Sequence, residues 1–502
     1  MKKIFYICTL CFFASCSSFL EPKSQTEYVP RDVNALNELL LGNAYLDPND
    51  QSNSVFSYNE IFSDDWSCAV ADGNNTANAI KYDSYKPYFA WHPNMFRLAN
   101  DYGIYRNIWK NTYQYILGCN AVLDYLHGVS GTESEKKYIK GQATALRAFY
   151  YFQLVNLFGE PYNFNKDALG VPLKLNSNLE LDYPSRAKVE EVYKQIEQDL
   201  TVAEECFTLL PATMQFIKNG RVTLPMVQFM KTRVALFMEN YDEVIVNGTK
   251  VINNWGLALT DLNSFTSLAG QPYYSFCSYN NPEAVWLFGS SSDFSRFATE
   301  HIYPLSTSIS QNRRMFNASA SLLNSFETDD LRKTNYIIKE SASLSSFVPI
   351  GKIPVNTSYV PVTTEFGRAL RLSEVYMMLA EAFYHKSRNQ DAVAMLETVR
   401  KKRYKSSSGG SYKVPASNTS GTALFAFIKA ERRREMCFEG LRWFDLRRWG
   451  MESFSRDWKE EGMVTQTFKI EKNDPAFTLP IPFDAIEKNP NLVQNKLSTP
   501  KY

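Results

Sequence analysis

The chain has few of the side chains from which most catalytic and metal sites are built. Its 502 residues include four histidines, and no two of them have the spacing of the zinc-binding patterns H-E-x-x-H or H-x3-H. The phosphate-binding loop of the Walker A type, the nucleophile elbow G-x-S-x-G and the dinucleotide fingerprint G-x-G-x-x-G are also absent. The sequence therefore predicts no catalytic residue, no metal site and no cofactor, and we expect that the protein is not an enzyme.

An excess of charge of one sign is missing as well. Lys and Arg total 54 while Asp and Glu total 53, and this balance argues against a nucleic-acid-binding protein, which usually carries a basic face. The cysteines after Cys16 are odd in number and have no C-x-x-C spacing, so we expect neither a disulfide framework nor a zinc ribbon. Several of them lie in apolar segments and are predicted to be small buried residues. These cysteines are Cys68, Cys119, Cys206, Cys277 and Cys437.

No apolar run is long enough to cross a bilayer as a helix, which takes about 20 residues. The N-terminal run over residues 4–14 follows two lysines and is followed by Ser15 and Cys16. This order is typical of a secretory signal peptide, and its ending on a cysteine resembles the lipobox of bacterial lipoproteins; a plain signal peptide is the alternative. We expect residues 1–15 to be a lipoprotein signal peptide, Cys16 to be lipidated, and residues 16–30 to tether the lipid to a single domain over 31–502.

Most of the chain after residue 100 has the period of amphipathic helices. Helices are expected at about 31–47, 104–126, 145–158, 189–203, 223–239, 241–253, 368–386, 389–403 and 421–438. The pairs 223–239 with 241–253 and 368–386 with 389–403 each span about 34 residues, the length of a tetratricopeptide repeat. The predicted fold is mainly α, with a helical repeat scaffold over about 100–255 and 366–450.

Two parts of the chain lack this period. Residues 48–100 are rich in Asn, Asp, Ser and Pro with aromatic residues between them, and we expect a long irregular excursion there. Residues 256–365 are predicted to be rich in loops, with strand-like fragments at 284–288 and 336–339. Because long ordered loops commonly carry function, both parts are candidates for a ligand-binding region.

The segment from Glu431 to Gly450 reads E-R-R-R-E-M-C-F-E-G-L-R-W-F-D-L-R-R-W-G. This run resembles the C-terminal hallmark of the RagB/SusD family of Bacteroidetes lipoproteins. Further similar segments are Ala145–Phe152 with Leu157–Gly159, Val189–Tyr193, Arg371–Tyr376, Leu479–Pro482 with Asn489–Pro490, and Cys16 followed by Phe19, Leu20 and Pro22. From residues alone, Arg432–Arg434 are interpreted as part of a helix rich in salt bridges, because Glu431, Glu435 and Glu439 lie one turn apart beside them.

The resemblance implies a SusD-like fold, with four tetratricopeptide-like helical hairpins packed against a loop-rich variable region. It also implies an outer-membrane lipoprotein, anchored by lipid and exposed on the cell surface. Members of the family sit over a SusC-like TonB-dependent transporter and capture a nutrient, most often a glycan, without being enzymes. The matching segments belong to the scaffold, so they do not identify the ligand.

A glycan site needs flat rings for the apolar face of a sugar and polar side chains for its hydroxyl groups. Residues 62–94 and 273–281 contain both kinds of side chain, and Trp66 and Trp91 are the preferred stacking platforms. The competing interpretation is that these rings pack the loop onto the helical body, as we expect for Trp286, Trp443 and Trp449 in the core. The predicted ligand contacts are Asp65, Trp66, Asn75, Tyr85, Tyr88, Trp91, Tyr273, Tyr274 and Phe276.

Three functions remain compatible with the sequence. The first is a glycan-binding partner of a SusC-like TonB-dependent transporter, attached to the membrane through its lipid anchor. The second keeps this architecture but captures peptides. The third is a tetratricopeptide-like scaffold that binds only proteins. A neighbouring transporter gene would favour the first two over the third.

Overall fold

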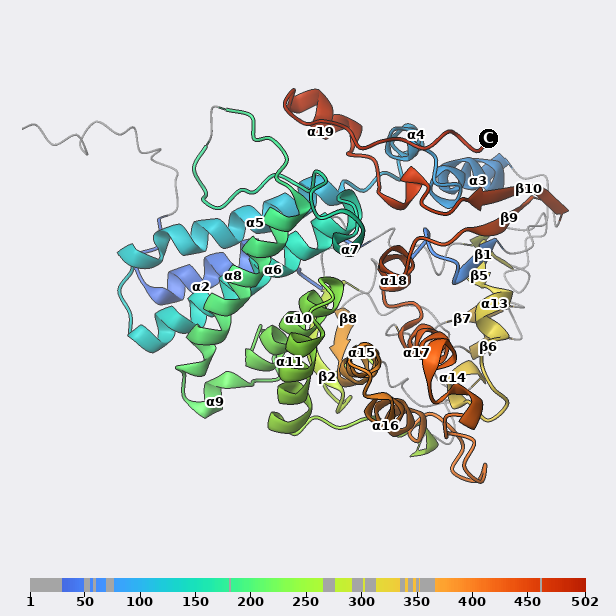
Figure 1. The fold of residues 1–502 in the computed structure, drawn as a ribbon. Coiled ribbons are helices and arrows are strands. Elements are labelled where there is room, and N and C mark those ends of the chain that lie inside the picture. Colours follow the sequence, from blue (N-terminus) through green and yellow to red (C-terminus); the bar gives the residue numbers. More distant parts are fainter. Residues whose placement is uncertain are drawn as a thin grey trace, which may run out of the picture.

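The computed structural model is mainly α-helical, with several short two-stranded sheets (Figure 1). It describes residues 29–48, 55–56, 60–68, 76–179, 182–264, 276–290, 301–302, 313–334, 339–341, 346–348, 352, 366–460 and 463–502. Cys16, the predicted signal peptide and nearly all of the predicted tether lie outside these residues. Within them, no helix combines the length and the apolar character that crossing a membrane would require.

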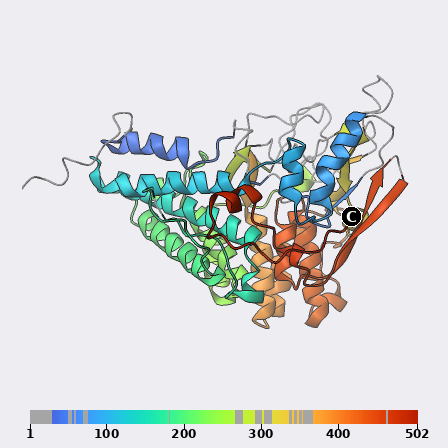
Figure 2. The same ribbon diagram turned by 90° about the horizontal axis from the view of Figure 1, so that it is seen from above.

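The longer helices form a curved scaffold that runs from the blue and cyan helices through the green ones to the orange ones (Figures 1 and 2). They are α2 (Val33–Asn43), α5 (Ile108–Tyr125), α6 (Glu133–Phe158), α8 (Val189–Thr208), α10 (Leu224–Phe237), α11 (Tyr241–Asn254), α15 (Leu372–His385), α16 (Asn389–Arg400) and α17 (Gly421–Met436). Each helix predicted from the apolar period is present, with its ends moved by a few residues, except that α6 begins about three turns earlier than expected.

Capping residues explain where several of these helices begin. The side chain of Asp32 accepts a hydrogen bond from the Ala35 amide at the start of α2. A reciprocal pair between Thr132 and Glu135 closes the first turn of α6, which accounts for its early start. The Asn240 side chain accepts from the Glu243 amide at the start of α11. Each cap satisfies an amide that the helix itself leaves without a partner.

Helices that follow each other in the chain pack in pairs. Helix α10 packs on α11, and α15 packs on α16, as the 34-residue spacing predicts. Helix α11 also contacts α15, so the two pairs form one continuous layer although residues 255–371 separate them in the sequence. At the other end of the scaffold, α6 contacts both α5 and α8.

Shorter helices and strands complete the structure, many of them on the side of the molecule opposite α2 (Figure 1). The short helices are α3 (Thr76–Phe89), α4 (Met95–Asp101), α7 (Tyr162–Asn165), α9 (Ala212–Gln215), α13 (Ala320–Leu323), α14 (Leu331–Thr334), α18 (Arg442–Arg448) and α19 (Phe483–Lys488). The antiparallel strand pairs are β1 (Trp66–Cys68) with β5 (Phe316–Ala318), β2 (Ala284–Ser290) with β8 (Phe366–Arg371), β3 (His301–Ile302) with β4 (Arg313–Arg314), β6 (Lys339–Ser341) with β7 (Ser346–Val348), and β9 (Phe454–Glu460) with β10 (Met463–Ile470). Strand β2 confirms the predicted strand-like fragment at 284–288.

The prediction that residues 48–100 are irregular throughout is wrong for its second half. Helices α3 and α4 occupy much of residues 76–101. Helix α3 has no apolar stripe along its whole length, and Pro87 lies near its C-terminal end. Its last turns are nonetheless buried, through Tyr85, Tyr88 and Phe89 at a spacing of three and four residues. The apolar face is therefore only about one turn and a half long, which is too short to stand out in the sequence.

The interior is continuous and rich in aromatic rings. Trp286 and Trp443 are 2% and 0% exposed and belong to this core, as predicted. Trp449 is half-buried, and its indole nitrogen donates to Glu381 Oε1 at 3.1 Å. The five cysteines after Cys16 are free and buried, which confirms their predicted role as small core residues, and burial raises the pKa of the Cys68 thiol to about 12.

Candidate functional site

The structure describes six of the nine predicted ligand contacts, and all six are buried. Their exposed fractions do not exceed 8%, the value for Tyr85. The six are Asp65, Trp66, Tyr85, Tyr88, Trp91 and Phe276. The other three predicted contacts, Asn75, Tyr273 and Tyr274, lie outside the described residues. A ring without an open face cannot stack on a sugar from solution, so the prediction for the buried rings needs correction.

Trp66 and Trp91 pack the segment 60–68 onto the helical body. The Trp66 ring is 2% exposed and lies 4.7 Å from the ring of Phe438, centroid to centroid. Trp91 is fully buried, and its indole nitrogen donates to the Phe62 carbonyl at 3.0 Å. Its φ angle of 51° is one that non-glycine residues adopt rarely. These contacts correspond to the competing interpretation, in which both rings are structural.

Tyr85, Tyr88 and Phe276 are likewise part of the interior. The Tyr85 ring meets Phe316 of β5 edge-on at 5.7 Å, and Tyr88 lies 6.3 Å from Phe62. Phe276 is 1% exposed, with the guanidinium of Arg371 4.2 Å from its ring centroid. None of the three rings presents a face to solvent in this structure.

Asp64 and Asp65 form ion pairs with the segment that carries the family resemblance. Asp64 accepts from Arg442 at 2.6 Å, and Asp65 accepts from Arg433 at 2.7 Å. Although burial opposes ionisation, the Arg442 and Arg433 guanidiniums lower the pKa of Asp64 to about 2. Burial raises the pKa of Asp65, against the attraction of Arg433. The predicted glycan contact Asp65 is therefore a structural ion-pair partner.

Arg456 on β9 is a structural residue that the sequence did not reveal. Its guanidinium lies between the rings of Phe89 and Trp91, at 3.9 Å and 4.1 Å from their centroids. It donates to the carbonyls of Ile61 (2.6 Å) and Ser63 (2.8 Å) and also to that of Phe89. Burial strongly lowers the pKa of this guanidinium. One side chain thus joins segment 60–68, the end of α3 and strand β9.

The arginine-rich run 432–434 belongs to helix α17, which contributes to a buried ion-pair network through the neighbouring Glu435. Glu435 of α17 contacts Arg332 at 3.1 Å, Arg371 at 3.1 Å and Arg403 at 2.9 Å, and all four side chains are fully buried. Burial disfavours the charged form, yet the arginines, Arg403 foremost, hold the pKa of Glu435 well below its usual value. The interpretation of this run as part of a helix rich in salt bridges is confirmed. Most of the ion-pair partners, however, come from other elements rather than from the same helix.

The network extends along α17 on both sides of Glu435. Glu431, one turn earlier, pairs with Arg400 at 2.7 Å and with Arg434 at 2.6 Å. Glu439, which follows the helix, pairs with Arg371 at 2.5 Å and contacts Lys352. The network therefore fixes β8, α14, α16 and α17 relative to one another, because removing one partner from a buried ion pair leaves an uncompensated charge.

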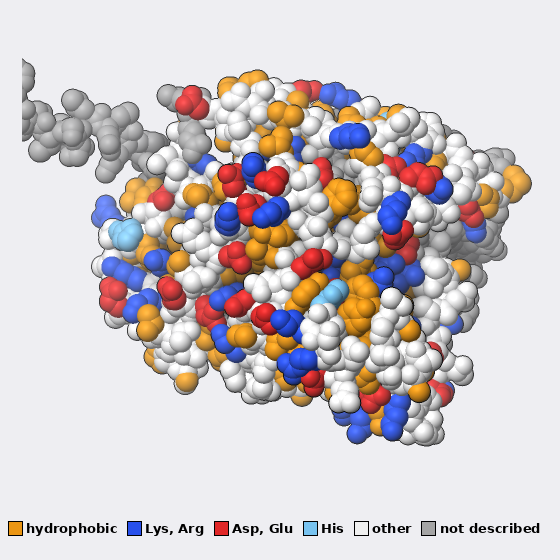
Figure 3. Space-filling model, in the orientation of Figure 1, with side chains coloured by type: hydrophobic (Ala, Val, Ile, Leu, Met, Phe, Trp, Pro, Cys, Tyr) orange, Lys and Arg blue, Asp and Glu red, His pale blue; other side chains and the backbone are white. Residues whose placement is uncertain are grey.

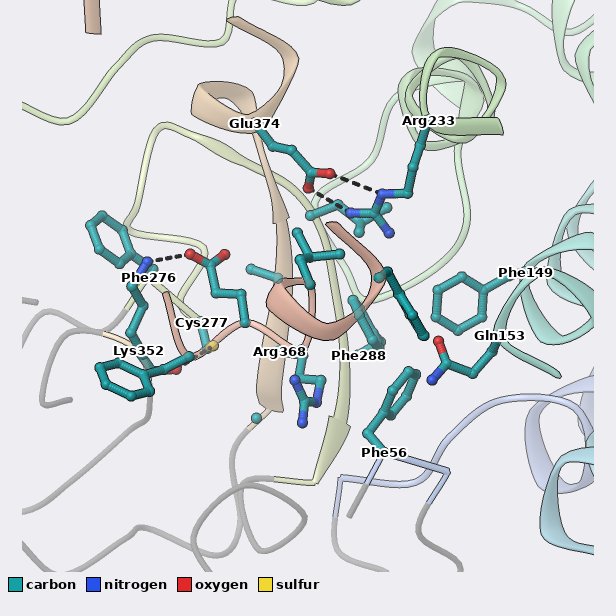
Figure 4. Close-up of a pocket in the computed structure, with 18 of the residues that line it drawn as sticks. Phe56, Phe149, Gln153, Arg233, Phe276, Cys277, Phe288, Lys352, Arg368 and Glu374 are labelled. Atoms are coloured by element: carbon teal, nitrogen blue, oxygen red, sulfur yellow. Dashed lines mark hydrogen bonds and ion pairs between the residues drawn. The ribbon is translucent and has the colours of Figure 1, made fainter. Parts of the chain in front are cut away.

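A narrow cavity lies between this network and the helical scaffold (Figure 4). Arg233 and Glu374 form a two-point ion pair at one side, with distances of 3.0 Å and 2.6 Å. Phe56 and Arg368 lie together at the opposite side of the view in Figure 4. The cavity holds about 40 Å³ for water-sized molecules. That volume suits a few water molecules and excludes a sugar ring.

The surface agrees with the balanced charge of the sequence. Figure 3 shows acidic and basic side chains interspersed over one whole face, without a large area of one sign. Among the described residues, no cluster of three or more His, Cys, Asp or Glu side chains is arranged to hold a metal ion.

Two family profiles match the chain. The profile of the SusD family matches residues 362–502, and a second, described as starch-binding associating with outer membrane, matches residues 19–223. The first includes the hallmark segment 431–450, and the second includes α2, α5, α6 and α8. The chain belongs to the RagB/SusD family.

Relatives and solved structures agree with this assignment. SusD-like protein P2 of Formosa agariphila is 29% identical over 113 residues, which are 22% of this chain and 21% of the relative, so the match spans about a fifth of that protein. A SusD superfamily protein of Bacteroides thetaiotaomicron superposes with a TM-score of 0.67 at 22% identity, covering 92% of this chain and 98% of that one. A SusD-like carbohydrate binding protein of Bacteroides vulgatus gives 0.66 at 21% identity, with coverage of 93% and 99%.

Family membership confirms the predicted mainly α, SusD-like fold. Members of the family are non-enzymatic carbohydrate-binding proteins, in agreement with the expectation that this protein is not an enzyme. Membership also supports a glycan-binding role and an association with the outer membrane.

Proposed function

We propose that the protein is a cell-surface lipoprotein that captures a glycan and delivers it to a SusC-like TonB-dependent transporter in the outer membrane. The observation that carries this proposal is the pair of family profiles, one of which is described by starch binding and outer-membrane association. The proposed anchor is a lipid on Cys16. The similar structure from Bacteroides vulgatus is described as a carbohydrate binding protein, which favours glycans over peptides as the class of ligand.

Since six of the nine predicted contacts are buried, we propose that Asn75, Tyr273 and Tyr274 carry what remains of the predicted site. Phe276 and Cys277 line the cavity of Figure 4 beside Lys352. Asn75, Tyr273 and Tyr274 lie outside the described part of the chain, so the proposal rests on the chemistry of their rings and amide.

The test is glycan binding by variants in which these rings are removed. We expect Tyr273→Ala and Tyr274→Ala to weaken retardation in polysaccharide affinity gels by about tenfold, because the proposed stacking of sugar rings on these tyrosines is lost. Tyr102→Ala is the matched control, since Tyr102 is 40% exposed and follows α4. Equal retardation of all three variants and the parent protein would show that Tyr273 and Tyr274 do not contact the glycan.

A further inference from the structure

Helix α5 carries a row of apolar side chains that passes from the core to the surface. Trp109, Tyr113, Leu117 and Ala121 recur every four residues and therefore lie near one face of the helix. Trp109 is 7% exposed and belongs to the core, Tyr113 is half-buried, and Leu117 is 44% exposed. The outer part of this row offers an apolar surface to a ligand.

Two hollows follow this stripe, and together we name them the α5 groove. The first, of about 400 Å³, lies between α5, residues 172–184 and α19, and includes Trp109, Tyr113 and Leu492 in its lining. The second, of about 450 Å³, lies between α5 and α2. Gln114 and Leu117 border both hollows, so the two adjoin along α5. From Trp109 to Ala121 the groove follows α5 for about 18 Å, and both volumes fall in the range of ligand sites.

Hydrogen bonds hold the walls of the groove in place. The Tyr113 hydroxyl donates to the Pro172 carbonyl at 2.7 Å, and the Asn489 amide donates to the Pro184 carbonyl at 2.9 Å. Asp484 of α19 accepts from Tyr105 at 3.0 Å and from Asn107 at 2.5 Å. Figure 2 shows the dark red α19 lying over the cyan α5. A groove built in this way is formed before a ligand arrives, which lowers the entropic cost of binding.

The charged side chains on the rim of the groove that have neither a hydrogen-bond nor an ion-pair partner among the described residues are lysines. The oxygens of Asp484, the only carboxylate in the groove lining as described, already accept two hydrogen bonds. Lys174 donates to Asn176 and to the Asn178 carbonyl. In the part of the chain that the structure describes, neither Lys110 nor Lys488 has a carboxylate within salt-bridge distance. Both are exposed, so their ammonium groups are available to an anion.

We propose that the α5 groove binds an acidic saccharide, one that carries carboxylate or sulfate groups along an extended chain. The C–H faces of the sugar rings pack on Tyr113 and Leu117, and the acidic groups pair with Lys110 and Lys488. The inference rests on the proposed glycan-binding function and deepens it by naming a class of glycan. It also adds a binding surface on the helical scaffold to the proposed contacts at Asn75, Tyr273 and Tyr274.

Calorimetric titration of the mature chain with oligogalacturonate of several units tests this proposal. We expect saturable binding that weakens between low and physiological salt, because the lysines are exposed to screening. The double variant Lys110→Gln with Lys488→Gln should weaken binding about tenfold, and Leu117→Glu should weaken it at least as much. Lys140→Gln is the matched control, because Lys140 is an exposed helix lysine outside the groove.

The outcomes separate this proposal from the proposed function. Unchanged affinity in the groove variants would overturn the groove assignment. Binding of neutral glycans without binding of oligogalacturonate would overturn it too, while leaving the proposed function intact. If an acidic peptide such as oligoglutamate binds the groove more tightly than the saccharide, the ligand class is wrong. If no saccharide of any kind binds the parent protein, the proposed function itself fails.

Discussion

At the scale of single residues, the structure depends on arginines whose charge is satisfied by backbone carbonyls. Arg456 donates to three carbonyls and has a ring on each face. Arg186 is similar, since it donates to the carbonyls of Gly170, Phe158, Leu169 and Val493, and burial lowers its pKa to about 10. Such a side chain fixes irregular backbone that no sheet or helix supports.

We expect Arg456→Leu to lower the free energy of unfolding by about 2–4 kcal/mol. The substitution leaves the carbonyls of Ile61, Ser63 and Phe89 buried without a donor, and each such loss costs about 1–3 kcal/mol, partly offset by the smaller cost of burying leucine. Urea denaturation measures the change. Ser455→Ala, at an exposed position of the same strand, is the control and should have little effect. An unchanged unfolding free energy for Arg456→Leu would show that water replaces the guanidinium.

The pKa of Asp64 predicts how acid affects stability. Because the pKa is lower in the folded protein, about 2 against an ordinary 3.8, the unfolded chain binds the proton first as the pH falls. The stabilising contribution of Asp64, about 2 kcal/mol, is present above pH 4 and is lost as the pH falls from about 4 to 2. Urea titrations between pH 2.5 and 5 should give a shallower pH dependence for Asp64→Asn than for the parent protein. Equal slopes would mean that Asp64 is not ion-paired in solution.

At the scale of elements, the network around α17 holds together strands and helices that are far apart in the chain. Glu435 is its centre, with three fully buried arginines: Arg332 from α14, Arg371 from β8, and Arg403 from the turn after α16. The run 431–450, which carries the family resemblance, therefore has a structural role. Its presence predicts the family and the fold but says little about the ligand.

We expect Glu435→Gln to destabilise the protein by about 3–5 kcal/mol, because a buried ion pair that loses one partner leaves the other charge uncompensated. Here three arginines lose part of their counter-charge at once. Glu452→Gln is the matched control: Glu452 pairs with Lys472 at an exposed site, where the side chains are 65% and 58% exposed. That variant should change the unfolding free energy by no more than about 0.5 kcal/mol. A similar, small effect for both variants would show that the network contributes no net stability.

The elements that the sequence predicts well are those with a long local period. Helix α15 is an example, since its buried residues recur along four turns. Strands β9 and β10 were not predicted, although Phe454, Arg456 and Trp458 occupy alternate positions along β9. Trp66 and Trp91 could not be placed in this way. Their polar neighbours Asp64 and Asp65 suggest an exposed loop, and the arginines that pair with them lie about 370 residues further along the chain.

At the scale of the whole molecule, we expect the helical body to be anchored to the membrane by a lipid on Cys16, its first mature residue. We predict that Cys16→Ala releases the protein from the membrane fraction, because the lipid chains of a modified cysteine supply the anchoring and the described helices offer no membrane span. Fractionation of cells that express the variant gives the answer. Retention of the variant in the outer membrane, in cells without the transporter, would rule out the lipid anchor.

The fold of the described residues also limits where a glycan can bind. The cavity of Figure 4 is too small for a sugar ring, and the buried tryptophans are not available. The candidate contacts that we propose are therefore Asn75, Tyr273 and Tyr274 together with the α5 groove.

The most direct measurement is calorimetric titration of the soluble chain over residues 17–502, which lacks the lipidated Cys16, with a panel of neutral and acidic polysaccharides and with peptides. We expect saturable binding of at least one polysaccharide, no binding of the peptides, and no release of reducing ends during long incubation. Binding of peptides alone, or the appearance of new reducing ends, would contradict the central claim that this protein captures glycans without cleaving them.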